Sequence, residues 1–222
     1  MLNDRFRVTV MDLPGFGNSG SIKDASMDLF AEEVNRVVIS AGIDKCVLIG
    51  HSMGGYTALA YAKKFGTSLL GMGLLHSTAN ADSEERKLKR DQAIRVIEEK
   101  GYEAYINNFI PPLFSPSFQD KGAINKILKE GLRTSAEGLK NALSAMKTRP
   151  DSNDWIASTR LPLLFVSGKE DGIIPESDLI RQAALAQQSM LISLKHSGHM
   201  GMIEEPETCA KTISEFMEYC YP

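Results

Sequence analysis

The sequence predicts an α/β protein with a mostly parallel sheet flanked by helices, and three observations support this. Short apolar runs alternate along the chain with longer segments of helical periodicity, which is the pattern of β-α-β units. Serine, histidine and acidic residues follow the ends of the apolar runs. Hydrophobic residues make up 43% of the 222 positions and charged residues 24%, so one domain with a sizeable core is expected.

The first part of the chain is expected to alternate strands and helices. Apolar runs cover residues 5–12, 45–50 and 69–76, and helical patterns cover 26–40 and 53–65. The first helical pattern has an apolar stripe made of Phe30, Val34, Val37, Val38 and Ala41. Strands joined by helices in this way lie parallel in one sheet.

The last part of the chain repeats the alternation. Residues 161–168 and 190–196 have the pattern of strands, and residues 176–188 and 206–219 have the pattern of helices. Pro206 stands at the start of the last helix, where a proline ring suits the first turn. The two parts of the chain are therefore expected to share one sheet.

Between these parts lies a segment without strand patterns, residues 78–159. It is polar and helical in pattern, and the prolines of Ile110–Phe118 exclude one continuous helix. We expect a helical cap insertion over one edge of the sheet, with residues 1–77 and 160–222 forming the core.

The charge balance argues against polyanionic partners. The formal net charge is −3 and the isoelectric point is near 5.9, whereas nucleic acid and anionic membrane surfaces attract basic patches. No apolar run approaches the roughly 18 residues needed to cross a bilayer, and the first residues lack a signal-peptide pattern. Cys46, Cys209 and Cys220 have no metal-binding or redox spacing and are expected to be core residues of a cytoplasmic protein.

Three residue types that act together in nucleophilic catalysis follow different predicted strands. Ser52, Asp171 and His199 each stand within a few residues of the end of an apolar run. Ligands of open parallel sheets bind beyond the carboxyl ends of the strands, so these side chains are expected to meet. Serine is a weak nucleophile that needs a neighbouring base, for which His199 is the candidate, and Asp171 would orient the imidazole and stabilise its charged form.

The turn around the serine has the pattern G-x-S-x-G in Gly50–Gly54. Glycines on both sides allow the backbone to approach the serine closely in a sharp strand-to-helix turn. The hydroxyl of Ser52 is then exposed at the amino end of a helix, where the N–H of Met53 and the helix dipole favour an oxyanion. Met53 is therefore the predicted oxyanion donor.

Four motifs, "DLPGFGNSG", "GHSMGG", "GKEDGIIP" and "GHMGMIEEPE", occur in this order along the chain. With them, Phe6–Pro222 resembles the serine hydrolases of the α/β-hydrolase fold, and Met146–Trp155 is similar to the end of the cap in enol-lactonases and small-ester hydrolases. The resemblance implies Ser52 as nucleophile, Asp171 as acid and His199 as base.

Two of these assignments have a rival in the sequence. Glu170 stands beside Asp171, and His196 precedes His199 by three residues. The resemblance favours Asp171, at the aspartate of "GKEDGIIP", and His199, within "SGHMGMIEEPE". The serine at position 52 argues against the dehalogenase and epoxide-hydrolase branches, which resemble this fold with an aspartate there.

A glycine pattern in the first loop has a competing interpretation. Gly15–Gly20 satisfies G-x-G-x-x-G directly after a predicted strand, as in dinucleotide-binding loops. The next helical pattern begins only near Ser26 and no acidic residue ends the next strand, which argues against dinucleotide binding. The loop is instead expected to border the active site. No cofactor is expected, and His196 and His199 lack the accompanying motif that would indicate a metal.

Candidate substrate-pocket residues come from the loops and the insertion. They are Phe16, His51, His76, Phe109, Phe114 and Trp155. Each could line an acyl or alcohol pocket, and ordinary packing is an equally good account of each. His76 is expected to be structural or pocket-lining rather than catalytic.

One part of the family pattern is missing from the sequence. Family members open with a strand ending in a His-Gly motif, whose loop supplies a second oxyanion N–H, and losing one such donor costs about a hundred- to a thousandfold in rate. In the sheet, this missing strand would lie between the strands predicted at residues 5–12 and 45–50. Three interpretations stay open: the sequence is part of a longer protein, the two flanking strands pair directly, or a second molecule completes the sheet. We favour the first.

The sequence therefore predicts a cofactor-independent serine hydrolase that cleaves a small or medium carboxylic ester or lactone through an acyl-enzyme. Two alternatives remain: a non-hydrolytic reaction of the same side chains, such as acyl transfer or carbon–carbon bond cleavage, and a non-catalytic ligand-binding protein. The expected partner is the small-molecule substrate, with no nucleic acid and no membrane. A homo-oligomer is compatible with the sequence.

Overall fold

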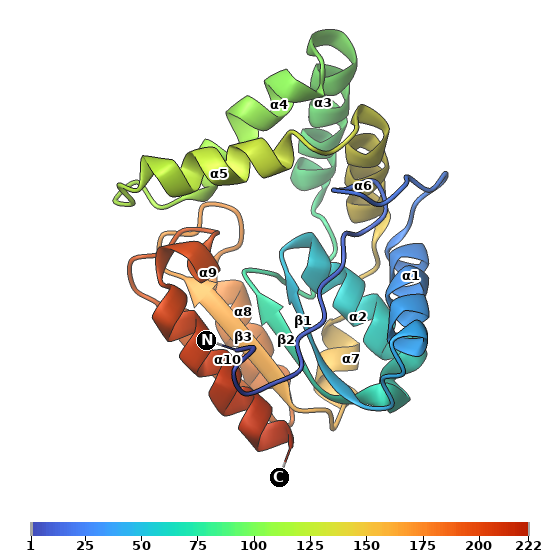
Figure 1. Cartoon of the computed structure of the whole chain (residues 1–222), viewed down its shortest axis with the longest axis vertical. Helices are drawn as coiled ribbons and strands as arrows, with labels where there is room; N and C mark the ends of the chain where they lie inside the picture. Colours follow the sequence, from blue (N-terminus) through green and yellow to red (C-terminus); the bar gives the residue numbers. More distant parts are fainter. Residues whose placement is uncertain (1, 222) are drawn as a thin grey trace.

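The fold is built on a four-stranded parallel sheet in the computed structural model, which describes residues 2–221 (Figure 1). The strands are β1 (Cys46–His51), β2 (Leu69–Leu75), β3 (Leu163–Gly168) and β4 (Ser189–Leu194). They lie in the order β1-β2-β3-β4, each parallel to the next. The predicted strands at 45–50, 69–76, 161–168 and 190–196 are thereby confirmed, as is the α/β class.

Helices cover both faces of the sheet. On one face lie α1 (Met27–Ser40), α2 (Met53–Phe65) and α8 (Glu176–Leu185), and on the other lies α10 (Pro206–Cys220). The short elements are η1 (Gly66–Ser68), η2 (Pro111–Leu113), α7 (Asn153–Ser158) and α9 (Gly201–Glu204). Among residues 2–221, no helix combines the length and the apolar character that a membrane span needs.

Successive residues of β3 supply two separate cores. Leu163 and Phe165 belong to the cluster beneath α1, α2 and α8, whereas Leu164 and Val166 belong to the cluster beneath α10. This alternation follows from the pleat of a strand, in which neighbouring side chains point to opposite faces. A strand covered on both faces has to be apolar throughout, which explains the unbroken apolar run.

Two of the three cysteines are core residues, as expected. Cys209 and Cys220 lie on the face of α10 that packs against the sheet, and burial raises the pKa of both thiols to about 11. Cys46 is half-buried at the start of β1, where burial also raises the pKa of its thiol. All three are free thiols.

The insertion forms a separate helical layer beyond the carboxyl ends of the strands (Figure 1). Its helices are α3 (Glu84–Lys100), α4 (Tyr102–Phe109), α5 (Lys121–Gly131) and α6 (Ala136–Thr148). They have an apolar cluster of their own, made of Ile97, Ile106, Ile110, Leu113, Phe114, Leu139, Leu143 and Met200. Met200 comes from the core domain, so this cluster also joins the layer to the segment after β4.

The end of the insertion differs from the expectation. The sequence predicts a cap that extends over residues 78–159, whereas α7, near the end of this range, packs against the main core. Ile156 is fully buried there with Leu179 of α8, and Trp155 packs against the same cluster. The helical layer over the sheet therefore ends with α6.

Residues 5–12 form no strand, and this prediction is wrong. A cavity of about 790 Å³ is lined by this segment on one side and by β1 on the other, and extends from Arg5 and Tyr221 to His51. A β-strand needs a neighbouring strand to satisfy its backbone hydrogen bonds. The cavity separates residues 5–12 from β1, which is the nearest strand, so these bonds cannot form. Val10 is 88% exposed. The structure therefore does not show the direct pairing of residues 5–12 with β1.

Candidate active site

Ser52 stands on a sharp turn between β1 and α2. Its φ is +50° and its ψ is −117°, a conformation that costs about 1–3 kcal/mol and persists only where the surroundings hold it. The backbone N–H of Ser52 donates to the carbonyl of Leu75 at 2.9 Å, and the hydroxyl of Ser77 donates to the carbonyl of Ser52 at 2.8 Å. The end of β2 therefore fixes the serine turn.

The two glycines of the G-x-S-x-G pattern have different surroundings. A Cβ on Gly50 would overlap the backbone of Gly54, so the turn leaves no room for a side chain there. A Cβ on Gly54 would meet no atom within 4 Å. The expectation that both glycines are needed for space is therefore correct for Gly50 and wrong for Gly54.

His199 connects the serine to the acid. Its Nε2 lies 2.9 Å from Ser52 Oγ, and its Nδ1 lies 2.9 Å from Asp171 Oδ2. The side chain of His199 is 3% exposed and that of Asp171 is 1% exposed. With its hydrogen on Nδ1, the imidazole donates to the carboxylate and presents a lone pair on Nε2 to the hydroxyl.

Asp171 is held by four donors. The N–H groups of Ile173 and Ile174 donate to Oδ1 at 2.7 and 3.0 Å, and His199 and His76 approach Oδ2. Burial by itself would raise the pKa of this carboxyl, but the hydrogen bonds from the two histidines and the backbone outweigh it and hold the pKa well below its usual value. The carboxylate is therefore ionised at neutral pH.

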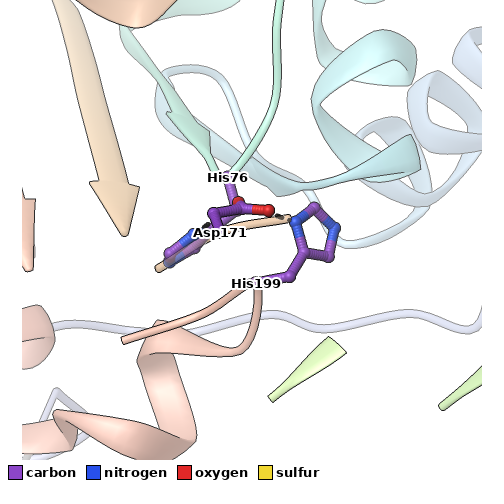
Figure 2. Close-up of side chains that lie close together, drawn as sticks. All are labelled: His76, Asp171 and His199. Atoms are coloured by element: carbon purple, nitrogen blue, oxygen red, sulfur yellow. Dashed lines mark hydrogen bonds and ion pairs between the residues drawn. The ribbon is translucent and has the colours of Figure 1, made fainter. Parts of the chain in front are cut away.

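His76 contacts the same carboxylate oxygen of Asp171 as His199 does (Figure 2). Its Nδ1 is 3.2 Å from Asp171 Oδ2, and its side chain is fully buried. The structure thus buries His76 against the carboxylate of Asp171, with no exposed side-chain surface to line a pocket. The donor atoms of His76, Asp171 and His199 lie within 4.8 Å of one another, close enough for a metal ion, but hydrogen bonds already account for this spacing.

A third histidine supports the backbone of His199. Nε2 of His51 is 2.8 Å from the carbonyl oxygen of His199, to which it donates, and the two ring centroids are 5.0 Å apart. Burial and the nearby charge of His199 lower the pKa of His51 to about 3, so its ring is neutral. The predicted pocket residue His51 is therefore half-buried against the base.

The loop that carries His199 is attached to the helical layer. The backbone N–H of His199 donates to the carbonyl of Leu113 in η2 at 2.7 Å. The carboxylate of Glu204 accepts from the N–H of Ser115 at 2.6 Å and from the N–H of Met200 at 3.0 Å. Glu204 is not among the predicted site residues, although it lies within the motif "GHMGMIEEPE".

The rival residues have other contacts. Glu170 is exposed and accepts a hydrogen bond from the hydroxyl of Ser115 at 2.6 Å. His196 is also exposed, and its backbone N–H donates to Glu205 at 2.8 Å. The side chains joined by hydrogen bonds to Ser52 are thus His199 and Asp171, and not their rivals.

Met53 is the first residue of α2, directly after the serine. The N–H groups of the first helical turn have no acceptor within the helix and lie at the positive end of the helix dipole. A negative oxygen next to Ser52 would therefore find a suitable donor in the N–H of Met53.

The aromatic pocket candidates do not gather at one place. Phe114 is buried within the cluster of the helical layer, and Phe16 packs against the same cluster. Phe109 is 38% exposed and stacks on Tyr105 at 5.2 Å. Trp155 lies on α7, in the main core.

The glycine-rich loop has the structure of a turn. The N–H of Gly15 donates to the carbonyl of Gly20 at 3.0 Å, and α1 begins only at Met27. Thr134 donates through its hydroxyl to the carbonyl of Gly15 at 2.8 Å. The loop therefore joins the helical layer and lacks the helix start that a dinucleotide-binding loop needs.

Known proteins resemble this chain along nearly its whole length. Residues 1–206 match the family described as alpha/beta hydrolase fold. The chain is similar to 3-oxoadipate enol-lactonase 1 of Acinetobacter baylyi, with 25% identity over 98% of this chain and 80% of that protein. Its structure is similar to that of a thermophilic esterase from Thermogutta terrifontis with malate bound, at 33% identity and a TM-score of 0.93, covering 99% of this chain and 82% of that one.

Proposed function

Because this chain belongs to the α/β-hydrolase family, we propose that it is a serine hydrolase that cleaves a small or medium carboxylic ester or lactone. The observation that carries the proposal is the pair of 2.9 Å hydrogen bonds from Ser52 through His199 to Asp171. This arrangement gives a hydroxyl the base that it needs, and gives the base an anion that stabilises its charged form.

In the first half of the reaction, Ser52 Oγ attacks the acyl carbon while its hydrogen passes to Nε2 of His199. The imidazolium then donates from Nδ1 to the carboxylate of Asp171, which stays ionised. The N–H of Met53 donates to the negative oxygen of the tetrahedral intermediate. When the intermediate collapses, the leaving alcohol takes the proton from Nε2 and the acyl group stays on Ser52.

In the second half, a water molecule replaces the alcohol. It gives a proton to Nε2 of His199 and attacks the acyl carbon, and collapse of the second intermediate returns the proton to Ser52 Oγ. The products are a carboxylic acid and an alcohol, which form a single hydroxy acid when the substrate is a lactone. The similarity to an enol-lactonase and to an esterase supports this substrate class.

Labelling with a fluorophosphonate tests the nucleophile. The probe reacts with an activated serine, so intact mass should show one adduct on the native chain and none on Ser52→Ala. Ser158→Ala is the matched control because Ser158 is an exposed serine on α7, far along the chain from the turn. An adduct on Ser52→Ala would remove Ser52 as the nucleophile.

Ester and lactone panels test the substrate class, and their pH dependence tests the base. Hydrolysis should fall on the acid side, because a protonated His199 cannot accept the serine hydrogen. A rate that stays flat between about pH 5 and 8 would argue against His199 as the base. A labelled enzyme that turns over no ester or lactone in the panel would contradict the substrate class.

A further inference from the structure

A second histidine contacts the acid of the candidate site. Asp171 Oδ2 lies 2.9 Å from Nδ1 of His199 and 3.2 Å from Nδ1 of His76. The rings of His76 and His199 approach the carboxylate from two segments of the chain, His76 directly after β2 and His199 in the loop after β4 (Figure 2). In the proposed reaction His199 is the only histidine that transfers a proton. The contact between His76 and Asp171 therefore needs a separate explanation.

The hydrogen of the His76 ring has a defined place. The backbone N–H of Gly201 donates to His76 Nε2 at 3.2 Å, so this nitrogen carries the lone pair and the hydrogen sits on Nδ1. Nδ1 is therefore the donor to Asp171. A neutral ring in this tautomer satisfies both partners, since a carboxylate can only accept and an amide N–H can only donate.

The surroundings hold His76 in a strained conformation. Its φ is +46°, which is unusual for a residue with a side chain, and its backbone N–H donates to the carbonyl of Val166 at 2.8 Å. A Cβ on Gly201 would overlap the ring, so the loop after His199 lies directly against it. Strain of this kind is retained where surrounding contacts fix it, and it is concentrated at functional sites.

We propose that His76 is a positioning residue of the proposed hydrolase, and this rests on the function assigned above. Its Nδ1–H fixes Oδ2 of Asp171, and its Nε2 fixes the loop of His199 through Gly201. One ring thus holds the loop of the acid and the loop of the base in a fixed relation. His76 is fully buried, so its ring has no exposed surface with which to contact a substrate.

The ionisable groups that face His76 define the expected change in pH dependence. They are Asp171, His199 and His51, whose ring centroid lies 5.9 Å away. While His76 donates to Oδ2, the negatively charged carboxylate of Asp171 accepts hydrogen bonds from both His76 and His199. Removing this donor leaves that charge to His199 alone and stabilises its protonated form, so the acid limb of the rate profile should move to higher pH.

Two substitutions distinguish the effect of losing the hydrogen bond to Asp171 from the effect of losing the ring itself. His76→Leu removes the donor, whereas His76→Asn keeps an N–H near the position of Nδ1. We expect His76→Leu to slow fluorophosphonate labelling and kcat by about 10- to 100-fold, the usual effect of losing a hydrogen bond to a charged group. KM should change little, the acid limb should move to higher pH, and His76→Asn should recover most of the rate.

Leu179→Ala is the control for lost stability. Leu179 is fully buried in the main core, on α8, so its truncation should lower the melting temperature without moving the acid limb. A native labelling rate and pH profile for His76→Leu would overturn the proposal. So would a labelling rate for His76→Asn as low as that of His76→Leu.

Nitrogen-15 NMR of the histidine rings gives a test that needs neither variant nor activity. His76 of the native chain should show a protonated Nδ1 and an unprotonated Nε2 at neutral pH. The opposite tautomer would overturn the proposal even if both variants failed to fold. A native chain that shows the expected tautomer but takes no fluorophosphonate would count against the proposed function alone.

Discussion

At the scale of single residues, Gly50 and Gly54 have the same place in a motif but different surroundings. Gly50→Ala forces a Cβ into the backbone of Gly54, so the turn that carries Ser52 has to distort. We expect the free energy of unfolding to fall by about 1–3 kcal/mol, as for other overpacked sites. Labelling should slow by about a hundredfold, because a small displacement of a nucleophile is costly. Urea unfolding and intact mass measure the two effects.

Gly54→Ala is the matched control in the same turn. A methyl group there meets no atom within 4 Å, and Gly54 lies in the first turn of α2. Alanine has a higher helix propensity than glycine, by up to about 1 kcal/mol. The control should therefore be as stable as the native chain or more stable. If both substitutions lower the free energy of unfolding and the labelling rate equally, the lack of room for a side chain at Gly50 does not explain the need for glycine.

The site residues that could be predicted combine a suitable side chain with a position just after a predicted strand. Ser52, Asp171 and His199 each follow an apolar run, and the structure joins them by hydrogen bonds. His76 also follows a strand, but a second histidine on the carboxylate has no place in the pattern of serine, histidine and acid, so its contact with Asp171 was not predicted. Glu204 was not predicted either, because its partner is the backbone N–H of Ser115, and a backbone group leaves no mark in the sequence.

At the scale of elements, one carboxylate joins the loop of the base to the helical layer. Glu204 of α9 accepts hydrogen bonds from the N–H of Ser115, the hydroxyl of Ser197 and the N–H of Met200. These donors flank His199 on the loop side and follow η2 on the layer side. The geometry of the base therefore depends on an element of the insertion.

Glu204→Gln should weaken this connection. The amide loses the charge and one acceptor position, so a buried donor is left without a partner, at a cost of about 1–3 kcal/mol. We expect a lower melting temperature and faster proteolysis of the segment around η2, together with slower labelling of Ser52. Differential scanning fluorimetry and limited proteolysis measure the structural effects.

Glu205→Gln is the matched control on the neighbouring residue. The carboxylate of Glu205 accepts from the backbone N–H of the exposed His196, at 2.8 Å. Its loss should change the melting temperature by much less. If the two substitutions have the same effect, the contact between α9 and the insertion does not hold the base.

The predicted strands that the structure confirms are those with a neighbouring strand in the sheet. The runs at 69–76 and 161–168 became β2 and β3, each with strands on both sides. Residues 5–12 alternate apolar and polar side chains, which also suits a strand, but they have no neighbour at hydrogen-bonding distance, so the structure gives them no strand. The pattern shows that a segment is suited to a strand, but the pairing comes from the rest of the chain.

At the scale of the whole molecule, the sheet has an unpaired edge that faces a cavity. Within residues 2–221, β1 pairs with β2 alone, and its other edge borders the cavity of about 790 Å³. The walls include apolar side chains from both sides, such as Val34, Val38, Leu48 and Met11. An open strand edge beside an apolar cavity is a site where another strand can pair.

This edge should be visible in hydrogen exchange. Backbone amides of β1 that face the cavity have no acceptor on β2, so they should exchange with deuterium much faster than the amides of β3, which lies between two strands. NMR-detected exchange at neutral pH measures both. Equal protection of β1 and β3 would mean that a strand fills the cavity in solution. The elution volume of the protein at increasing concentration would then show whether that strand comes from a second molecule, which requires association, or from residues 5–12 of the same chain, which border the cavity.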